Sequence, residues 1–130
     1  TRNLYFGRMY PARGTTLTAA GFSLSAGWGA TASLTLTTPY RNTDTSGYFL
    51  VMAGGAGIAD SPSVTINFLD GGFTNGCIAL VTRMDSTSGV SGYWTGPVST
   101  LAGMTQATLR FIGLPISGLN IGAQYLIIGT

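Results

Sequence analysis

The chain has 130 residues, the length of a single domain that can bury a core without disulfides or metals. Only 8% of its residues are charged, and because Lys, Glu and His are all absent, most designs for acid–base catalysis at neutral pH are excluded. The net charge of +2 is too small to indicate nucleic-acid binding by itself, whereas so few surface charges favour association with other proteins.

The first 13 residues, TRNLYFGRMYPAR, form a basic and aromatic segment, which we interpret as an N-terminal arm before a single domain at 14–130. Three arginines give the arm a charge of +3, and three arginines against four aspartates leave the rest of the chain at −1. Arg and Tyr are enriched in the cores of protein interfaces. The candidate partner-binding residues of the arm are Arg2, Tyr5, Phe6, Arg8, Tyr10 and Arg13.

Three interpretations of the arm remain open. It can lie extended across a partner protein, or it can fold back as a first strand whose Arg side chains cover apolar surface. Basic and aromatic residues also suit nucleic acid, but three charges without any Lys disfavour that partner. The segment lacks the long apolar core of a signal peptide, and its first residue, Thr1, is consistent with removal of an initiator Met or of a longer leader.

After the arm, the sequence divides into eight short runs that favour β-strands, separated by turn signals. Several runs alternate apolar and polar residues, which predicts strands with one face on a core. The side chains expected to point inward are Leu34, Leu36, Val64, Ile66, Phe68, Leu109 and Phe111. The runs lie at 16–25, 31–38, 47–53, 63–69, 77–83, 90–96, 106–112 and 123–129.

Two runs are continuously apolar, YFLVM at 48–52 and YLIIG at 125–129. Such runs are typical of strands that are covered on both faces or lie in an interface. The connections are rich in Gly, Asn, Asp, Ser and Pro, which favour turns. The one weak candidate for a turn of helix is 98–107.

Eight short strands in one domain predict an all-β fold of two antiparallel sheets packed as a sandwich. A jelly roll is the arrangement that we favour, with an immunoglobulin-like sandwich or a small barrel as alternatives. The low charge also predicts self-association as a closed dimer or trimer. No apolar run approaches the roughly 20 residues that span a bilayer, so no membrane partner is expected.

The residues that carry catalytic or metal chemistry are few and scattered. Cys77 lies in a strand pattern without a His to activate it and is expected to be a buried thiol. Asp60 and Asp70 are the carboxylates that could pair as in a glycosidase, but each lies in a turn, where Asp usually caps the backbone. GGAGIAD at 54–60 lacks the GK[ST] ending of a phosphate loop and is interpreted as a turn. We therefore expect no enzyme activity, no metal and no cofactor.

Two tryptophans are the remaining candidates for a binding role. Trp28 lies between glycines in a predicted turn, and Trp94 follows Tyr93 in SGYWTG. Exposed rings on a β-sandwich are a natural platform for stacking a sugar, so both are candidate glycan-binding residues. The alternative, which we favour, is that both rings are core or interface anchors, because large aromatic side chains dominate burial.

A short, charge-poor, all-β chain rich in Gly, Thr and Ser, with a basic and aromatic arm, resembles virion structural proteins. More narrowly, it is similar to the small head decoration, or cement, proteins of tailed bacteriophages, several of which use jelly-roll or related β-folds. The resemblance implies a protein without a catalytic site that binds the major capsid protein on the capsid exterior, at junctions between capsomers, and stabilises the shell. Phage tail-fibre or receptor-binding tip domains, which bind host-surface glycans, share this composition and are the alternative.

Overall fold

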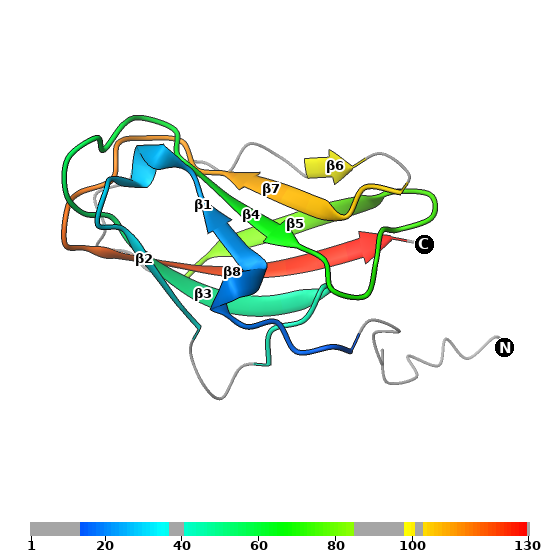
Figure 1. Cartoon of the computed structure of the whole chain (residues 1–130). Helices are drawn as coiled ribbons and strands as arrows, with labels where there is room; N and C mark the ends of the chain where they lie inside the picture. The colour runs from blue at the N-terminus through cyan, green and yellow to red at the C-terminus, as the bar shows by residue number, and fades with distance from the viewer. Residues whose placement is uncertain (1–13, 37–40, 85–97, 101–102, 130) are drawn as a thin grey trace, which may run out of the picture.

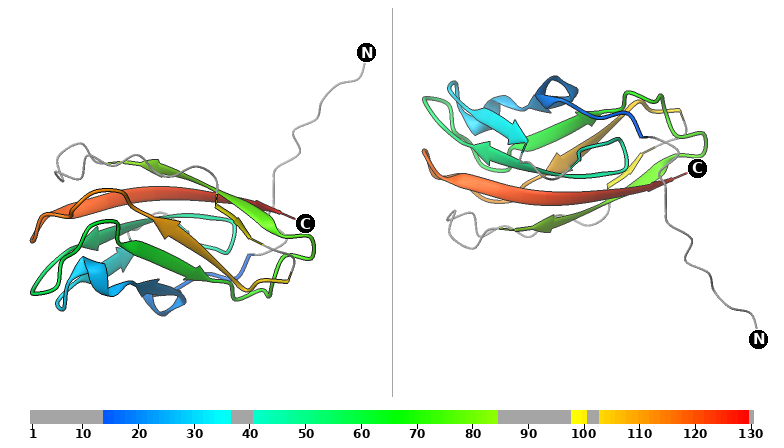
Figure 2. Two further views of the ribbon diagram at one scale, coloured as in Figure 1. Left: turned by 90° about the horizontal axis from the view of Figure 1, so that it is seen from above. Right: turned by 90° about the horizontal axis from the view of Figure 1, so that it is seen from below.

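The computed structural model describes residues 14–36, 41–84, 98–100 and 103–129. Within them the fold is all-β, because eight strands form one three-stranded and one five-stranded sheet, stacked face to face as a sandwich (Figures 1 and 2). The helical segments among these residues are two 3-10 turns, η1 (Ala19–Gly21) and η2 (Ala26–Trp28). The predicted two-sheet antiparallel sandwich is confirmed.

The strand order is β1-β4-β7 in the three-stranded sheet and β2-β3-β8-β5-β6 in the five-stranded sheet, and every pairing is antiparallel. The strands are β1 (Phe22–Leu24), β2 (Ser33–Leu36), β3 (Ser46–Met52), β4 (Ser63–Asn67), β5 (Cys77–Arg83), β6 (Val98–Thr100), β7 (Gln106–Arg110) and β8 (Asn120–Gly129).

The chain passes repeatedly between the two sheets. It changes sheet from β3 to β4, from β4 to β5, from β6 to β7 and from β7 to β8, whereas β2 and β3, and likewise β5 and β6, lie in the same sheet. This interleaving is consistent with the predicted jelly-roll-like sandwich. The strands β1 and β2 extend the two sheets, beside β4 and β3 respectively. The last strand, β8, therefore lies in the middle of the five-stranded sheet, where both of its edges are paired.

Seven of the eight predicted runs contain a strand, and the eighth, 90–96, lies outside the described residues. Two predictions are corrected. The run 16–25 is a strand only at β1, because Leu17 donates its N–H to Asn42 and the chain then turns through η1. The segment Val98–Thr100, considered for a helical turn, is a strand that pairs with β5.

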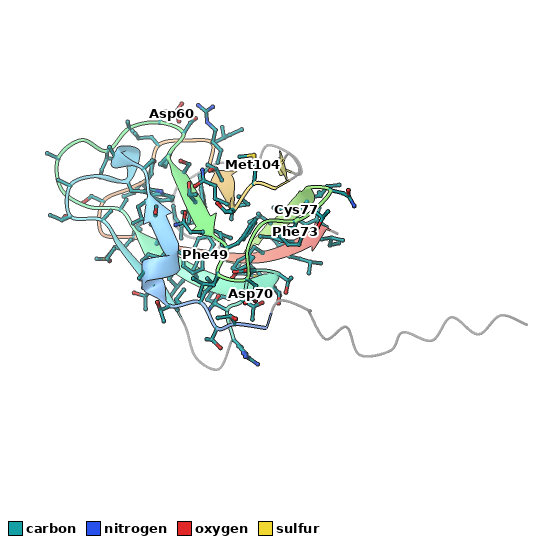
Figure 3. All side chains as sticks on the ribbon, turned by 45° about the vertical axis from the view of Figure 1, so that its right-hand side comes forward. Phe49, Asp60, Asp70, Phe73, Cys77 and Met104 are labelled. Carbon is teal, nitrogen blue, oxygen red and sulfur yellow. The ribbon has the colours of Figure 1, made fainter. Side chains whose placement is uncertain are left out.

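The core lies between the two sheets and is built mainly from the alternating residues. Five of the seven side chains predicted to point inward are buried, while Leu34 and Leu36 are partly buried against the same cluster. Large rings fill the centre, among them that of Phe49 (Figure 3). The rings of Phe22 and Phe49, which come from different sheets, have centroids 5.6 Å apart. The alternation therefore predicted the inner faces correctly.

Candidate functional site

The outer face of the three-stranded sheet is polar. Thr65 of β4 and Thr108 of β7 are cross-strand partners whose hydroxyl groups lie 2.9 Å apart. Beside them the amide of Asn67 donates to the Ser23 hydroxyl at 3.2 Å, and the side chain of Arg110 is exposed. Such side chains are typical of a sheet face that stays in contact with water.

The outer face of the five-stranded sheet is apolar where β5 and β8 pair. Ile78 lies opposite Ile128, and Leu80 lies opposite Leu126. All four side chains point away from the core, with between 38% and 52% of their surface exposed. We call these four residues the aliphatic patch. Directly opposed side chains on adjacent strands touch one another, so the patch is contiguous.

The same face continues across the sheet without a charge. Tyr48 of β3 lies over Gly122 of β8, whose added Cβ would come within 2.5 Å of the Tyr48 hydroxyl oxygen. Leu50 packs over the same glycine, and the side chains of Met52 and Met84 are exposed. Among the outward side chains described on this sheet there is no Asp, Glu, Lys or Arg.

The continuously apolar runs had two interpretations: strands covered on both faces, or strands that lie in an interface. The exposed aliphatic patch distinguishes between them. In YLIIG the residues Tyr125 and Ile127 are buried, but Leu126 and Ile128 are exposed, so the described residues cover only one face of the strand. Monomeric soluble proteins rarely expose contiguous apolar patches beyond a few hundred Å². The exposed half of YLIIG is therefore a candidate interface.

A second exposed apolar region lies in the connection between β7 and β8. Leu114 and Ile116 are 58% and 48% exposed there, on either side of the buried Pro115. The backbone of this loop is tied down, since Ser61 donates to Gly113 at 3.2 Å. This loop is separate from the aliphatic patch, because it follows β7 at the end of the sandwich.

A buried polar cluster, residues 42–44, lies just before β3 and fastens neighbouring segments together. The carboxylate of Asp44, which is 0% exposed, accepts hydrogen bonds from the backbone N–H groups of Leu69 at 2.9 Å and Asp70 at 2.7 Å. The amide oxygen of Asn42 accepts from the Tyr48 N–H at 2.7 Å. Buried polar groups that are satisfied in this way specify a single arrangement of the loops that they join.

The last strand is held to the same cluster by Tyr125. Its hydroxyl donates to the backbone carbonyl of Thr43 at 2.7 Å, and its ring is buried between the sheets. Burial raises the pKa of the Tyr125 phenol above its usual value near 10, and the neighbouring charge of Asp44 raises this pKa further, while the hydrogen bond to Thr43 lowers it. The phenol is thus a neutral hydrogen-bond donor and does not act as a proton acceptor at physiological pH.

The segment at residues 14–17, which we call the arm root, is bound to this region of the body. The Arg41 guanidinium donates to the Gly14 carbonyl and, at 3.0 Å, to the Thr16 hydroxyl. The N–H and hydroxyl of Thr15 both donate to the Asp70 carboxylate. Leu17, the last residue of the arm root, donates its N–H to the Asn42 carbonyl, and its side chain is buried in the core. The chain is therefore fixed to the body from Gly14 onward.

The residues predicted to bind partners fall in two groups. The six residues of the arm, and Trp94, lie outside the described residues. Trp28 is described, and it is 0% exposed: its ring packs edge-on against Phe111 with centroids 4.9 Å apart, and its indole N–H donates to the Ser63 carbonyl at 2.8 Å. The candidate glycan platform is therefore not available at Trp28, because a ring enclosed by the core cannot stack on a sugar.

The fold does not bring together the residues that were considered for catalysis or metal binding. Asp60 precedes β4 and Asp70 follows it, so they lie at opposite ends of a five-residue strand (Figure 3), too far apart to act on one glycosidic bond. Cys77 is buried, and GGAGIAD is a turn that leads into β4 and not into a helix. No group of three or more potential metal ligands is found within the described part of the chain. In that part no helix is long and apolar enough to cross a membrane.

The sequence indicated YLIIG as a run that could lie in an interface, but it did not single out Ile78 and Leu80, the other half of the aliphatic patch. Their signal was present, because CIALV at 77–81, like YLII at 125–128, places apolar residues at consecutive positions and not only at alternate ones. What the sequence lacked was the pairing of these two runs, which brings Ile78 to Ile128 and Leu80 to Leu126.

No protein-family model matches the chain, and comparison with curated proteins and with solved structures finds no significant similarity.

Proposed function

We propose that the protein is a non-enzymatic structural protein of a bacteriophage virion, which binds the outside of an assembled capsid shell and stabilises it as a decoration, or cement, protein. The observation that carries the proposal is the difference between the two outer faces of the sandwich. One face has hydroxyl, amide and guanidinium groups, and the other has paired Ile and Leu side chains without charge. Packing an apolar face of this kind against another protein is favourable by about 25 cal/mol per Å² of apolar surface buried.

The arm root supports a separate role for the arm in attachment to the shell. The Arg41 guanidinium donates to the Gly14 carbonyl, the Asp70 carboxylate accepts from the Thr15 N–H, and the side chain of Leu17 is buried, so the chain is fastened from Gly14 onward. Removing residues 1–13 leaves all of these contacts in place. The arm carries +3 while the rest of the chain carries −1, so its arginines suit an acidic surface on the major capsid protein better than their own body.

The proposal is tested by co-sedimentation of the purified protein with empty shells assembled from the major capsid protein of the same virus. We expect the full chain to pellet with the shells, and a variant that begins at Gly14 to fold but to stay in the supernatant. Replacing Arg2, Arg8 and Arg13 together by Ala should weaken binding and reduce its dependence on salt. Replacing Tyr5, Phe6 and Tyr10 should weaken it more, because aromatic anchors tend to be hot spots.

A matched control is Arg110→Ala, which removes an exposed arginine from the polar outer face and should leave shell binding unchanged. A full chain that ignores shells would refute the proposal. Binding of host-surface glycans in place of shells would favour the tail-fibre or receptor-binding alternative, for which Trp94 is the remaining candidate.

A further inference from the structure

We infer that the outer face of the five-stranded sheet is the docking site for a second copy of this chain, so that two sandwiches pack sheet against sheet about a two-fold axis. The inference concerns the same apolar face on which the proposed function rests, and it names a second copy of the chain as the partner of that face. It can be tested with the purified protein, without a shell.

The first argument is charge. In an isologous contact each surface meets a copy of itself, so any charged residue near the axis lies close to the same charge on the partner. The outward side chains described on β2, β3, β5 and β8 include no charged residue, and this penalty is therefore absent. The opposite face of the sandwich carries Arg110, so a contact between two copies of that face would bring like charges together.

The same argument disfavours the arm as the occupant of this face. Residues 1–13 carry three arginines, and the described face offers no carboxylate to receive any of them. Burying an arginine without a partner is costly, whereas burying Ile and Leu against Ile and Leu is favourable. An arm of this composition fits an acidic surface, and the face fits a surface like itself.

The second argument is size. Strands lie about 4.8 Å apart and rise about 3.3 Å per residue, so the five strands, which have 4, 7, 7, 3 and 10 residues, together present a face on the order of 500 Å². A protein interface of standard size takes about 800 Å² from each partner. The face is therefore large enough to account for most of a stable dimer interface.

The third argument is position. β8 is the middle strand of the sheet, and Leu126 of the aliphatic patch lies on it beside Leu80. Two antiparallel sheets that pack face to face stand about 10 Å apart, with their aliphatic side chains interdigitated. A two-fold axis through the middle of the sheet therefore places Leu80 and Leu126 near the same residues of the second copy.

Charge swapping at the patch tests this arrangement. One variant carries Leu80→Asp with Leu126→Asp, and the other carries Leu80→Arg with Leu126→Arg. By sedimentation velocity we expect the unmodified protein to dimerise, and each variant alone to have a dimer Kd at least about 100-fold weaker, because like charges then meet across the interface. An equimolar mixture of the two variants should form the dimer again, since opposite charges now face each other.

The matched control is Leu114→Asp with Ile116→Asp, which adds the same charges at equally exposed aliphatic residues outside the face and should leave the dimer intact. Circular dichroism and urea unfolding establish that every variant is folded. A strictly monomeric unmodified protein, a dimer that survives both patch variants, loss of the dimer in the loop control, or a mixture that stays monomeric would each overturn the inference.

The two proposals fail separately. If the monomeric Asp variant still co-sediments with shells through its intact arm, shell binding stands apart from dimerisation. A protein that dimerises through the face and ignores shells would refute only the proposed function.

Discussion

The hydroxyl of Tyr125 donates a 2.7 Å hydrogen bond to the backbone carbonyl of Thr43, which joins the central strand of the five-stranded sheet to the loop before β3. Asp44, the next residue of that loop, binds the backbone of Leu69 and Asp70, and Asp70 in turn binds Thr15 of the arm root. A continuous series of polar contacts therefore leads from the middle of the sandwich to the start of the arm.

Replacing Tyr125 by Phe should lower the free energy of unfolding by about 1–3 kcal/mol, because the buried carbonyl of Thr43 loses its donor. Urea unfolding followed by circular dichroism measures the change. Thr65→Val is the control, since it removes one partner of an exposed hydroxyl pair and should cost no more than about 0.5 kcal/mol. Equal effects of the two substitutions would contradict the role given to Tyr125.

The raised pKa of Tyr125 predicts a loss of stability at high pH. In the folded state burial, with a further contribution from Asp44, keeps the phenol protonated above pH 10, whereas in the unfolded chain it loses its proton near pH 10. The unfolded state then binds fewer protons, so the contribution is complete below about pH 10 and falls as the pH rises through the folded-state pKa. Between about pH 10 and 11 the free energy of unfolding should fall more steeply in the unmodified protein than in Tyr125→Phe, by no more than about 1.4 kcal/mol per pH unit. Parallel curves for the two proteins would rule this out.

Replacing Asp44 by Ala should destabilise the fold by about 2–4 kcal/mol, because the N–H groups of Leu69 and Asp70 both lose a charged acceptor. The midpoint of urea unfolding gives the change. Asp60→Ala is the matched control, as it removes an exposed carboxylate from a turn and should shift the free energy by less than about 0.5 kcal/mol. A neutral Asp44→Ala would show that the cluster contributes nothing to stability.

Gly47 permits the close approach of the polar cluster to β3. A Cβ at this position would lie 2.6 Å from the Tyr125 hydroxyl oxygen and closer still to the amide oxygen of Asn42. Gly47→Ala should therefore cost about 1–3 kcal/mol in thermal or urea unfolding. Gly57→Asn is the comparison, because no atom lies near that position and Asn tolerates its positive φ of 85°. If the two variants were equally stable, the steric argument would fail.

The arm root should loosen locally when its partners are removed. Asp70→Ala deletes the acceptor of the Thr15 N–H, so hydrogen exchange at that amide should become roughly tenfold faster. The amide of Leu17, which donates to Asn42, serves as the internal reference and should keep its protection. Faster exchange throughout the core would instead indicate global destabilisation.

Much of the fold could be predicted because the alternation of side chains along a strand has a fixed period. Val64 and Ile66 point inward and Thr65 points outward whichever strands lie beside them, so the sequence was sufficient to place them. The segment before β1 was predicted less well. Thr16 and Thr18 favour a strand locally, but the chain there is held by Arg41 and Asn42, residues that are distant in the sequence.

The candidate site, like the fold, could be predicted from the sequence only in part. Composition alone indicated a protein that associates with others, and the absence of Lys, Glu and His restricted its chemistry. Local pattern could not show that Trp28 is enclosed by Phe111, because burial of a turn residue depends on the elements that pack over it. Nor could it show whether YLIIG is covered on both faces.

The sequence by itself determined the all-β class, the inner face of most strands and the scarcity of charge, since each depends on residue type and on a local period. Only the tertiary structure decided that β5 and β8 are neighbours, which gathers Ile78, Leu80, Leu126 and Ile128 into one exposed patch. It also decided that Asp44 and Asp70 fasten the arm root. The physical reason is that this pairing is non-local: Ile78 and Ile128 lie 50 residues apart in the sequence and Leu80 and Leu126 lie 46 apart, and the free energy of burying both sheets together selects their pairing.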